Sequence, residues 1–307
     1  MVAGKSDLQL PLFSLPVTDA QEYCSSVLAI KDMETWWFLQ IGRRWYRGYS
    51  RPFEDYEGRW WWRGKPQFSY PLDLITPLDL PPRMPFGRSL LGWQCPVSAD
   101  FANSSLHFNI VQNLADYDLQ SVRASKRRAI RKGLKRLEVS LVDPMDLSIT
   151  DEACAVWNSH VRRTSWNVQC ELAVFRTWWQ PLVDMPGTVI LGVHDKDTGQ
   201  LCAWLIARII DHTVFLDTLA SRTDMLHHRP NDTLVFVLLS NAGRLGQVRY
   251  GNFFRRSLNT TIEKFKQSMG FETSGVPARV HLNNMTKFIP TFLRPASWER
   301  LRGDWHE

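Results

Sequence analysis

The chain lacks several of the patterns by which metal sites and cofactor sites are commonly found in a sequence. Its 307 residues include five cysteines, an odd number, with no C-x-x-C pair. Neither a zinc site nor a disulfide framework is therefore predicted. It also has no Walker loop, no Rossmann glycine pattern and no G-x-S-x-G nucleophile elbow. These absences leave nucleotide-dependent and serine-nucleophile chemistry without support in the sequence.

Long apolar runs are also absent. No stretch approaches the ~18 apolar residues that a membrane-spanning helix needs, so no span is predicted. Residues 1–16 contain no long apolar segment after Lys5, so we expect no signal peptide and a cytoplasmic protein. The composition, with 44% hydrophobic and 22% charged residues, is that of a globular chain long enough for one large domain or two lobes.

The most charged segment is a predicted helix at residues 121–137. Apolar residues at 130, 134 and 137 form one stripe, and basic residues cover the other faces. Like charges four residues apart repel, so a face of this kind either meets anions or pairs with carboxylates elsewhere in the fold. With a net charge of +6, the first alternative predicts phosphate binding. The candidate phosphate-binding residues are Arg127, Arg128, Arg131 and Lys132.

The first hundred residues differ from the rest. Residues 35–64 interleave tryptophan with arginine. This mixture could stack bases or sugars, or hold the protein at a membrane surface, or it could form strands whose rings pack on one face. Residues 65–100 are rich in proline, which predicts an extended connection. We therefore predict a smaller, irregular N-terminal lobe at 1–100 and a main domain at 101–307.

The main domain is predicted to alternate helices and strands. Strands are expected at 138–142, 188–193, 201–208, 213–219 and 279–282, and helices at 150–163, 170–180 and near the end of the chain. A buried helix starting at Asn231 or Asp232 and ending near Gly243 follows the second strand of a hairpin. This order predicts an α/β fold with a mixed, largely antiparallel sheet flanked by helices.

Three of these segments carry a resemblance to a known family. They are the basic helix, the Arg229-Pro230-Asn231-Asp232 helix entry, and the ending Phe265-Lys266…Gly270-Phe271. Together they resemble the Fem-type (FemAB/FemX-like) branch of the GNAT acyltransferase superfamily over roughly the last two-thirds of the chain. The resemblance implies a GNAT-like fold and transfer of an acyl or aminoacyl group to an amine. The donor would be an acyl-CoA, an acyl-carrier protein or an aminoacyl-tRNA, with no bound cofactor. The usual pyrophosphate-binding loop of GNAT enzymes contains closely spaced glycines, whereas residues 225–230 contain none. This difference disfavours acetyl-CoA as the donor.

Two residues are candidates for catalysis. The resemblance places a lysine at Lys266, where an ammonium could stabilise the oxyanion; the alternative is a surface lysine on an amphipathic helix. Asp217 lies within an apolar strand and is predicted on the same face as Phe215 and Leu219. Burial there could raise the pKa of its carboxyl group enough for it to act as a general base. The alternative is that Asp217 only forms an ion pair with an arginine.

The remaining candidates would bind substrate. Arg229, Asn231 and Asp232 would shape the helix start that holds donor or acceptor. Tyr250, Gly251 and Asn252 are expected to end a strand near this loop, where Asn252 could orient a substrate carbonyl. His227 and His228 are expected at the surface of a loop, and no metal site is predicted.

The sequence thus predicts an acyltransferase that works by direct amine attack on a phosphate-bearing donor. The rival interpretation is a non-catalytic nucleic-acid or polyanion binder that uses the basic helix.

Overall fold

The structure of the chain is a computed structural model. It describes residues 10–29, 37–41, 44–48, 52–64, 68–85, 92–165, 169–257 and 259–283. The helix predicted near residue 298 lies outside them. Two compact units are present, one made of Met1–Thr18 and Ile110–Glu272, the other of Asp19–Asn109 and Thr273–Glu307. The domain boundary expected near residue 100 stays a prediction.

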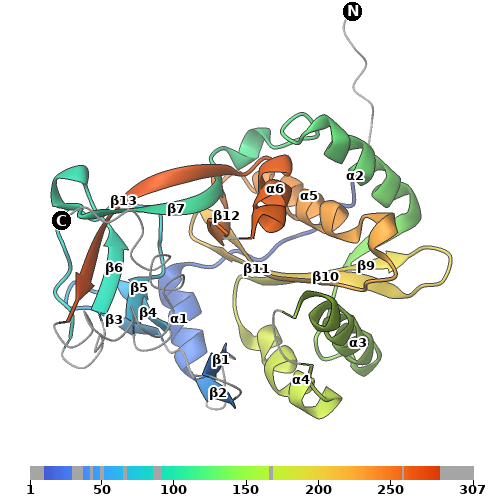
Figure 1. Cartoon of the computed structure of the whole chain (residues 1–307), viewed down its shortest axis with the longest axis horizontal. Helices are drawn as coiled ribbons and strands as arrows, with labels where there is room; N and C mark the ends of the chain where they lie inside the picture. Colours follow the sequence, from blue (N-terminus) through green and yellow to red (C-terminus); the bar gives the residue numbers. More distant parts are fainter. Residues whose placement is uncertain are drawn as a thin grey trace, which may run out of the picture. The chain divides into compact units, whose positions relative to one another are not determined.

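The first unit is built on a mixed sheet (Figure 1). Its strands are β8 (Leu137–Leu141), β9 (Thr188–Asp195), β10 (Leu201–Ile210), β11 (Thr213–Ser221) and β12 (Tyr250–Arg255), adjacent in the order β12-β11-β10-β9-β8. The pairs from β8 to β11 are antiparallel, whereas β11 and β12 run parallel. The α/β class and the four strands predicted between residues 138 and 219 are confirmed.

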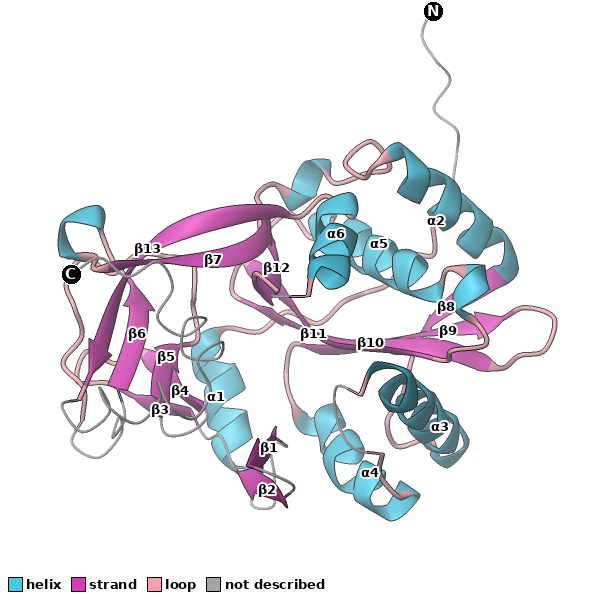
Figure 2. Cartoon of the chain, viewed as in Figure 1, coloured by secondary structure: helices cyan, strands magenta, loops and turns pink. Residues whose placement is uncertain are grey.

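Helices cover both faces of this sheet (Figure 2). On one side lie α5 (Pro230–Gly243) and α2 (Ala124–Arg136); on the other lie α3 (Leu147–Thr164) and α4 (Leu172–Trp179). A further helix, α6 (Thr260–Ser268), follows β12. None of the described helices has the length and apolarity to cross a bilayer.

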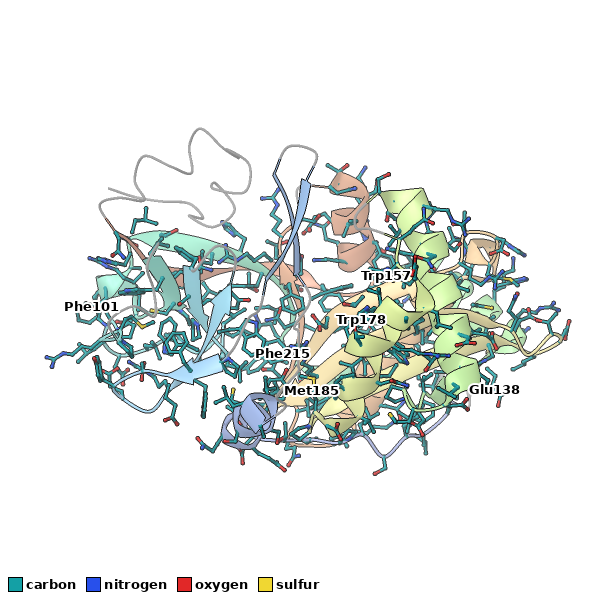
Figure 3. The ribbon with its side chains drawn as sticks, turned by 90° about the horizontal axis from the view of Figure 1, so that it is seen from below. Phe101, Glu138, Trp157, Trp178, Met185 and Phe215 are labelled. Atoms are coloured by element: carbon teal, nitrogen blue, oxygen red, sulfur yellow. The ribbon has the colours of Figure 1, made fainter. Side chains whose placement is uncertain are left out.

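The core of the first unit is centred on α5. This helix is buried on every side, from Asp232 to Gly243. The basic helix α2 crosses it closely, because a Cβ built on Gly133 would lie 2.0 Å from the hydroxyl oxygen of Thr233. Gly133 therefore allows an approach that any larger residue would prevent. Under the opposite face of the sheet, α3 and α4 enclose an aromatic cluster around Trp204 of β10, with Trp157 stacked on it at 6.1 Å between ring centroids (Figure 3).

Two predicted helix starts were wrong. The N-cap of α3 is Asp146, whose carboxylate accepts from the N–H groups of Ser148 and Ile149, and not Thr150, which lies inside the helix. The N-cap of α5 is Arg229, neither Asn231 nor Asp232. Arg229 has a left-handed backbone with φ of 65°, and Pro230 takes the first helical position, where its missing N–H is not needed.

The second unit contains a short helix and a second set of strands. These are α1 (Ala20–Ala29), β1 (Trp37–Ile41), β2 (Arg44–Gly48), β3 (Pro52–Glu54), β4 (Trp60–Gly64), β5 (Phe68–Pro71), β6 (Gly92–Pro96), β7 (Ser104–Val111) and β13 (Glu272–Leu282). Trp61 of β4 is fully buried and donates its ring N–H to Asp55 at 2.9 Å. Arg59 also binds Asp55. Here the ring packs inward, as the strand interpretation of the Arg/Trp segment requires.

Candidate functional site

The parallel strands β11 and β12 separate after a short paired segment. Their register runs from Thr213 opposite Tyr250 to Phe215 opposite Asn252, three residue pairs. Beyond that point β11 continues to Ser221 and β12 to Arg255. The two strands therefore present backbone groups that are not paired with each other. We call this place the β11–β12 divergence.

Both strands are irregular at the β11–β12 divergence. The β10–β11 register shifts between Ile206 and Ala207, which face Thr218 and Leu216, so that Asp217 is the extra residue of a β-bulge. In β12, Phe254 has a left-handed backbone with φ of 54°. Such strained conformations in non-glycine residues persist where surrounding contacts enforce them, and they concentrate at functional sites.

Asn252 occupies the last paired position of β12 and is fully buried. Its carbonyl oxygen Oδ1 accepts from the N–H of Phe254 at 2.7 Å. Its amide nitrogen Nδ2 is also buried and has no hydrogen-bond partner among the described residues. A buried donor without an acceptor has an unfavourable desolvation free energy, which a carbonyl oxygen of a ligand would offset by accepting a hydrogen bond. The structure therefore places a free buried donor at the β11–β12 divergence.

Lys266 of α6 is buried, with only 5% of its surface exposed. The expectation that it could be a surface lysine was wrong. Its ammonium donates to the backbone carbonyls of Phe253 at 2.6 Å and Arg255 at 3.2 Å, and it lies 4.7 Å from the centroid of the Phe253 ring. These two carbonyls flank Phe254, so Lys266 and Asn252 together hold the left-handed turn of the strand.

Asp217 lies on the bulge and binds Arg208 of β10 at 2.5 Å. It is partly exposed, with 29% of its side chain accessible. The bulge interrupts the alternation of the strand. Leu219 packs against the core cluster that includes α5, whereas Asp217 points to Arg208, so the predicted common face with Leu219 was wrong. The arginine partner expected as the alternative is present.

The start of α5 carries an ion pair with the basic helix. Asp232 is 4% exposed and pairs with Lys126 of α2. Arg229 is exposed, and the oxygen Oδ1 of Asn231 is buried without a described partner. Lys126 was not among the predicted site residues, although its position one turn before the buried Ile130 places it on the inner side of α2.

The four predicted phosphate-binding residues of α2 differ in their contacts. Arg127 donates to the side chain of Gln120 at 2.6 Å, and Lys132 donates to the carbonyl of His227 at 3.4 Å. Arg128 is exposed and Arg131 partly exposed, and within the described chain neither is paired with a carboxylate. Positive charge free to meet an anion is thus concentrated at Arg128 and Arg131.

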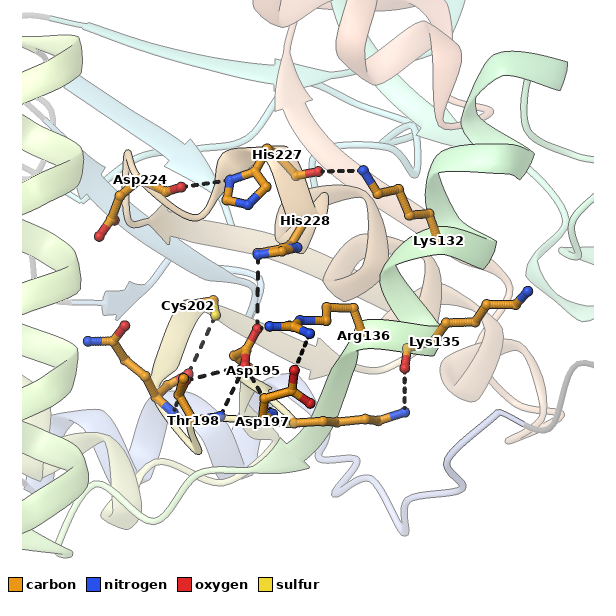
Figure 4. Close-up of polar contacts among 12 residues, drawn as sticks. Lys132, Lys135, Arg136, Asp195, Asp197, Thr198, Cys202, Asp224, His227 and His228 are labelled. Carbon is orange, nitrogen blue, oxygen red and sulfur yellow. Dashed lines mark hydrogen bonds and ion pairs between the residues drawn. The ribbon is translucent and has the colours of Figure 1, made fainter.

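The C-terminal end of α2 is fixed by a polar network around Asp195 (Figure 4). Burial alone would raise the pKa of Asp195, but hydrogen bonds from Arg136 and from the N–H groups of Thr198 and Asp197 bring it below its usual value. The ring nitrogen Nε2 of His228 lies 4.0 Å from the carboxylate oxygen Oδ2 of Asp195. Burial, then the neighbouring His227, lower the pKa of His228. His227 is exposed, as predicted, but His228 belongs to this network.

The structure brings the predicted residues together in two groups. Asn252 and Lys266 both bind backbone groups next to Phe254 of β12, and the start of α5 contacts α2 through Asp232 and Lys126. Tyr250 lies at the paired end of the two strands, opposite Thr213, and Asp217 contacts neither group through any described bond. Among the described residues, no group of three or more His, Cys, Asp or Glu is arranged to hold a metal ion.

The comparisons with known proteins concern the fold. No protein-family model matches the sequence, and no curated protein matches it. Among solved structures, the chain is similar to FemX, with a TM-score of 0.56 and 10% identity over 90% of this chain and 95% of that one. It is also similar to L-PGS from Bacillus licheniformis, with a TM-score of 0.53 and 12% identity over 81% and 88% of the two chains. A third structure is the C-terminal DUF2156 domain of a candidate lysylphosphatidylglycerol synthetase from Agrobacterium fabrum, with a TM-score of 0.50 and 11% identity over 77% and 85%. The chain therefore shares its fold with FemX and L-PGS, and the fold that the resemblance implied is confirmed.

Proposed function

We propose that this chain is an acyltransferase that joins an activated acyl or aminoacyl group to an amine at the β11–β12 divergence. The observation that carries the proposal is the buried amide nitrogen of Asn252, which has no described partner and lies where the two strands separate. The likeness to FemX and L-PGS supports the fold on which such a site would be built.

The reaction requires a polarised carbonyl and an amine that loses a proton. The amine nitrogen attacks the acyl carbon, the N–C bond forms, and the C–S bond of a thioester or the C–O bond of an aminoacyl ester breaks. The leaving thiolate or alkoxide takes the proton. We assign Asn252 Nδ2 to hydrogen-bond the developing oxyanion, the type of preorganised donor that usually contributes most to such catalysis.

Lys266 and Asp217 take supporting roles in this proposal. The ammonium of Lys266 fixes the carbonyls on both sides of Phe254 and is assigned to contribute positive charge at this end of β12 while the oxyanion forms. The carboxylate of Asp217, held by Arg208, is assigned to receive the proton of the attacking amine and to pass it to the leaving thiolate or alkoxide. Since the sequence shows no nucleophile elbow, attack is direct; accumulation of an acyl-enzyme in intact-mass spectra would contradict this step.

The donor is proposed to carry phosphate, as CoA, an acyl-carrier protein or tRNA does. The first N–H groups of a helix lack intrahelical acceptors and attract anions. At α5 they are accompanied by Arg229, and Arg128 and Arg131 of α2 add exposed positive charge. Tyr250, Asn231 and Asp232 remain predicted parts of the substrate site, Asp232 through its ion pair with Lys126.

Turnover of an Asn252→Leu variant tests the assignment of the site. This variant keeps the branched shape of the buried side chain and removes the amide nitrogen, so transfer should fall by roughly 10²-fold or more, as when an oxyanion donor is removed. Because Leu also loses the contact to the N–H of Phe254, Asn252→Asp serves as the matched variant that keeps an acceptor there. Normal transfer by both would refute the role.

Binding to bulk tRNA at several salt concentrations separates the donor classes and tests the rival interpretation. An Arg128→Ala, Arg131→Ala pair should flatten the salt dependence by somewhat under one unit per lost phosphate contact. The matched control is Arg244→Ala, Arg249→Ala, which removes the same charge from other exposed positions. If tRNA binds and Asn252→Leu leaves every measurable activity unchanged, the plain polyanion binder is favoured. Weak binding that neither pair changes would remove both tRNA interpretations and leave thioester donors.

A further inference from the structure

A second cationic site lies on the α3 side of the sheet. A cavity of about 560 Å³ is lined by Ala155, Asn158, Ser159, Arg162, Arg222, Thr223 and Asp224. The four α3 residues are spaced so that they occupy one face of the helix. The other three follow directly after β11, in the segment that leads to α5. We call this the Arg162–Arg222 cavity.

The two segments that line this cavity, α3 and the residues after β11, are joined by hydrogen bonds. The N–H of Thr223 donates to the hydroxyl of Ser159 at 3.0 Å. Arg163, next to the cavity, donates to the carbonyl and the hydroxyl of Ser221, each at 3.2 Å. These contacts hold the helix and the end of the strand together before any ligand arrives, so the cavity is preformed.

The charges of the cavity favour an anion. Arg162 donates its Nε to the carbonyl of Asn158 at 3.3 Å, and no described carboxylate pairs with it. Arg222 is paired with Asp224 at 3.3 Å, a long contact for a charged hydrogen bond. The Arg222 side chain holds the pKa of Asp224 below its usual value. The lining therefore carries two guanidinium groups and one carboxylate.

We infer that the Arg162–Arg222 cavity binds a carboxylate or phosphate group of the amine acceptor. This inference rests on the proposed acyl transfer. The donor is assigned to α5 and α2, which cover the opposite face of the sheet (Figure 2), so the two reactants approach from different faces and meet at the β11–β12 divergence. Arg222 lies seven residues along the chain from Phe215, a reach of roughly 20 Å for an extended strand. The acceptor is thus an elongated molecule with an amine near one end and an anionic group near the other.

Peptide-resolved labelling of arginine with phenylglyoxal tests this inference without an acyl-transfer assay. Inorganic phosphate and acetate, compared at equal ionic strength, should slow the labelling of Arg162 and Arg222 and leave that of the exposed Arg244 unchanged. The better protector identifies the anionic group. Arg162→Gln removes a charged hydrogen bond to the anion, so it should weaken the protection of Arg222 about tenfold or more.

The direction in which Asp224→Asn changes the protection by anions distinguishes a site for an anion from a site for the amine. Asp224→Asn frees Arg222 and removes the local negative charge, so protection by the anion should become stronger. Weaker protection in Asp224→Asn, or equal labelling of Arg162 with and without both anions, would overturn the inference. So would protection of Arg162 by CoA or deacylated tRNA at the concentration that protects Arg128, because the cavity would then belong to the donor. None of these outcomes depends on turnover, so a failed transfer assay with intact protection would refute the proposed function alone.

Discussion

Replacing Lys266 by methionine should destabilise the end of β12. The change keeps the length of the side chain and removes the ammonium that binds the carbonyls of Phe253 and Arg255 at 2.6 and 3.2 Å. Those carbonyls remain in place and lose a charged donor, which costs about 1.5–3 kcal/mol for each such bond. Part of this cost is offset, because the lysine no longer has to be desolvated. We therefore expect a loss of about 3 kcal/mol in the free energy of unfolding, which corresponds to a lower Tm by roughly 6–12 °C.

Hydrogen exchange and thermal unfolding together measure this effect. The backbone amides of residues 253–255 should exchange faster in Lys266→Met, because the left-handed Phe254 loses one of the two contacts that hold it. Lys264, two residues earlier on the exposed side of α6, provides the matched control, and Lys264→Met should behave as the parent chain. If Lys266→Met and Lys264→Met unfold at the same temperature with the same exchange at residues 253–255, the assigned role of Lys266 is wrong.

Three further changes test the contacts that shape the first unit. Gly133→Ala would bring a Cβ to 2.0 Å from Thr233 Oγ1, so the free energy of unfolding measured in urea should fall by about 2 kcal/mol. Adding Thr233→Ala should restore part of this loss. If it restores none, the steric conflict does not lie between Gly133 and Thr233. Asn259 accepts from two N–H groups at the start of α6, so Asn259→Ala should cost about 1 kcal/mol by the same measurement, and an unchanged midpoint would deny the cap its role. Asp195 has a lowered pKa, because hydrogen bonds from Arg136 and two backbone N–H groups outweigh the effect of burial; its contribution is present above the unfolded pKa of about 4 and is lost as the pH falls below it. Asp195→Asn should therefore reduce the acid sensitivity of unfolding, and parallel pH profiles for the two chains would contradict that sign.

The elements that the sequence predicted well are those with a strong local pattern. The basic helix is present as α2 with Ile130 buried, and the apolar run after Arg229 forms α5. The strand β7 had a comparable signal, since Leu106, Phe108 and Ile110 alternate with more polar positions and are buried, and it could have been predicted. Only the end of β13 was predicted, because Gly275 and Pro277 interrupt the apolar pattern of its first half.

The candidate site depended on features that a local pattern does not contain. The strand containing Asp217 was predicted, but the bulge beneath it arises from the register with β10. Lys266 reads as a surface residue from its helical spacing and is buried only because β12 turns its carbonyls toward α6. Asn252 was a candidate from the sequence and stays one, while its buried amide became visible only from the three-dimensional contacts.

The most direct test of the proposed function is N-acyl transfer by the purified chain with a single variant as comparison. Acyl-CoA thioesters and aminoacyl-tRNAs would be supplied in turn with a pool of anionic amines, and new N-acylated products would be detected by mass spectrometry. We predict products with one donor class from the parent chain, and a loss of roughly 10²-fold or more in Asn252→Leu despite retained folding. Equal product formation by the two chains, or none from the parent chain with either donor class, would contradict the central claim that the β11–β12 divergence is an acyl-transfer site.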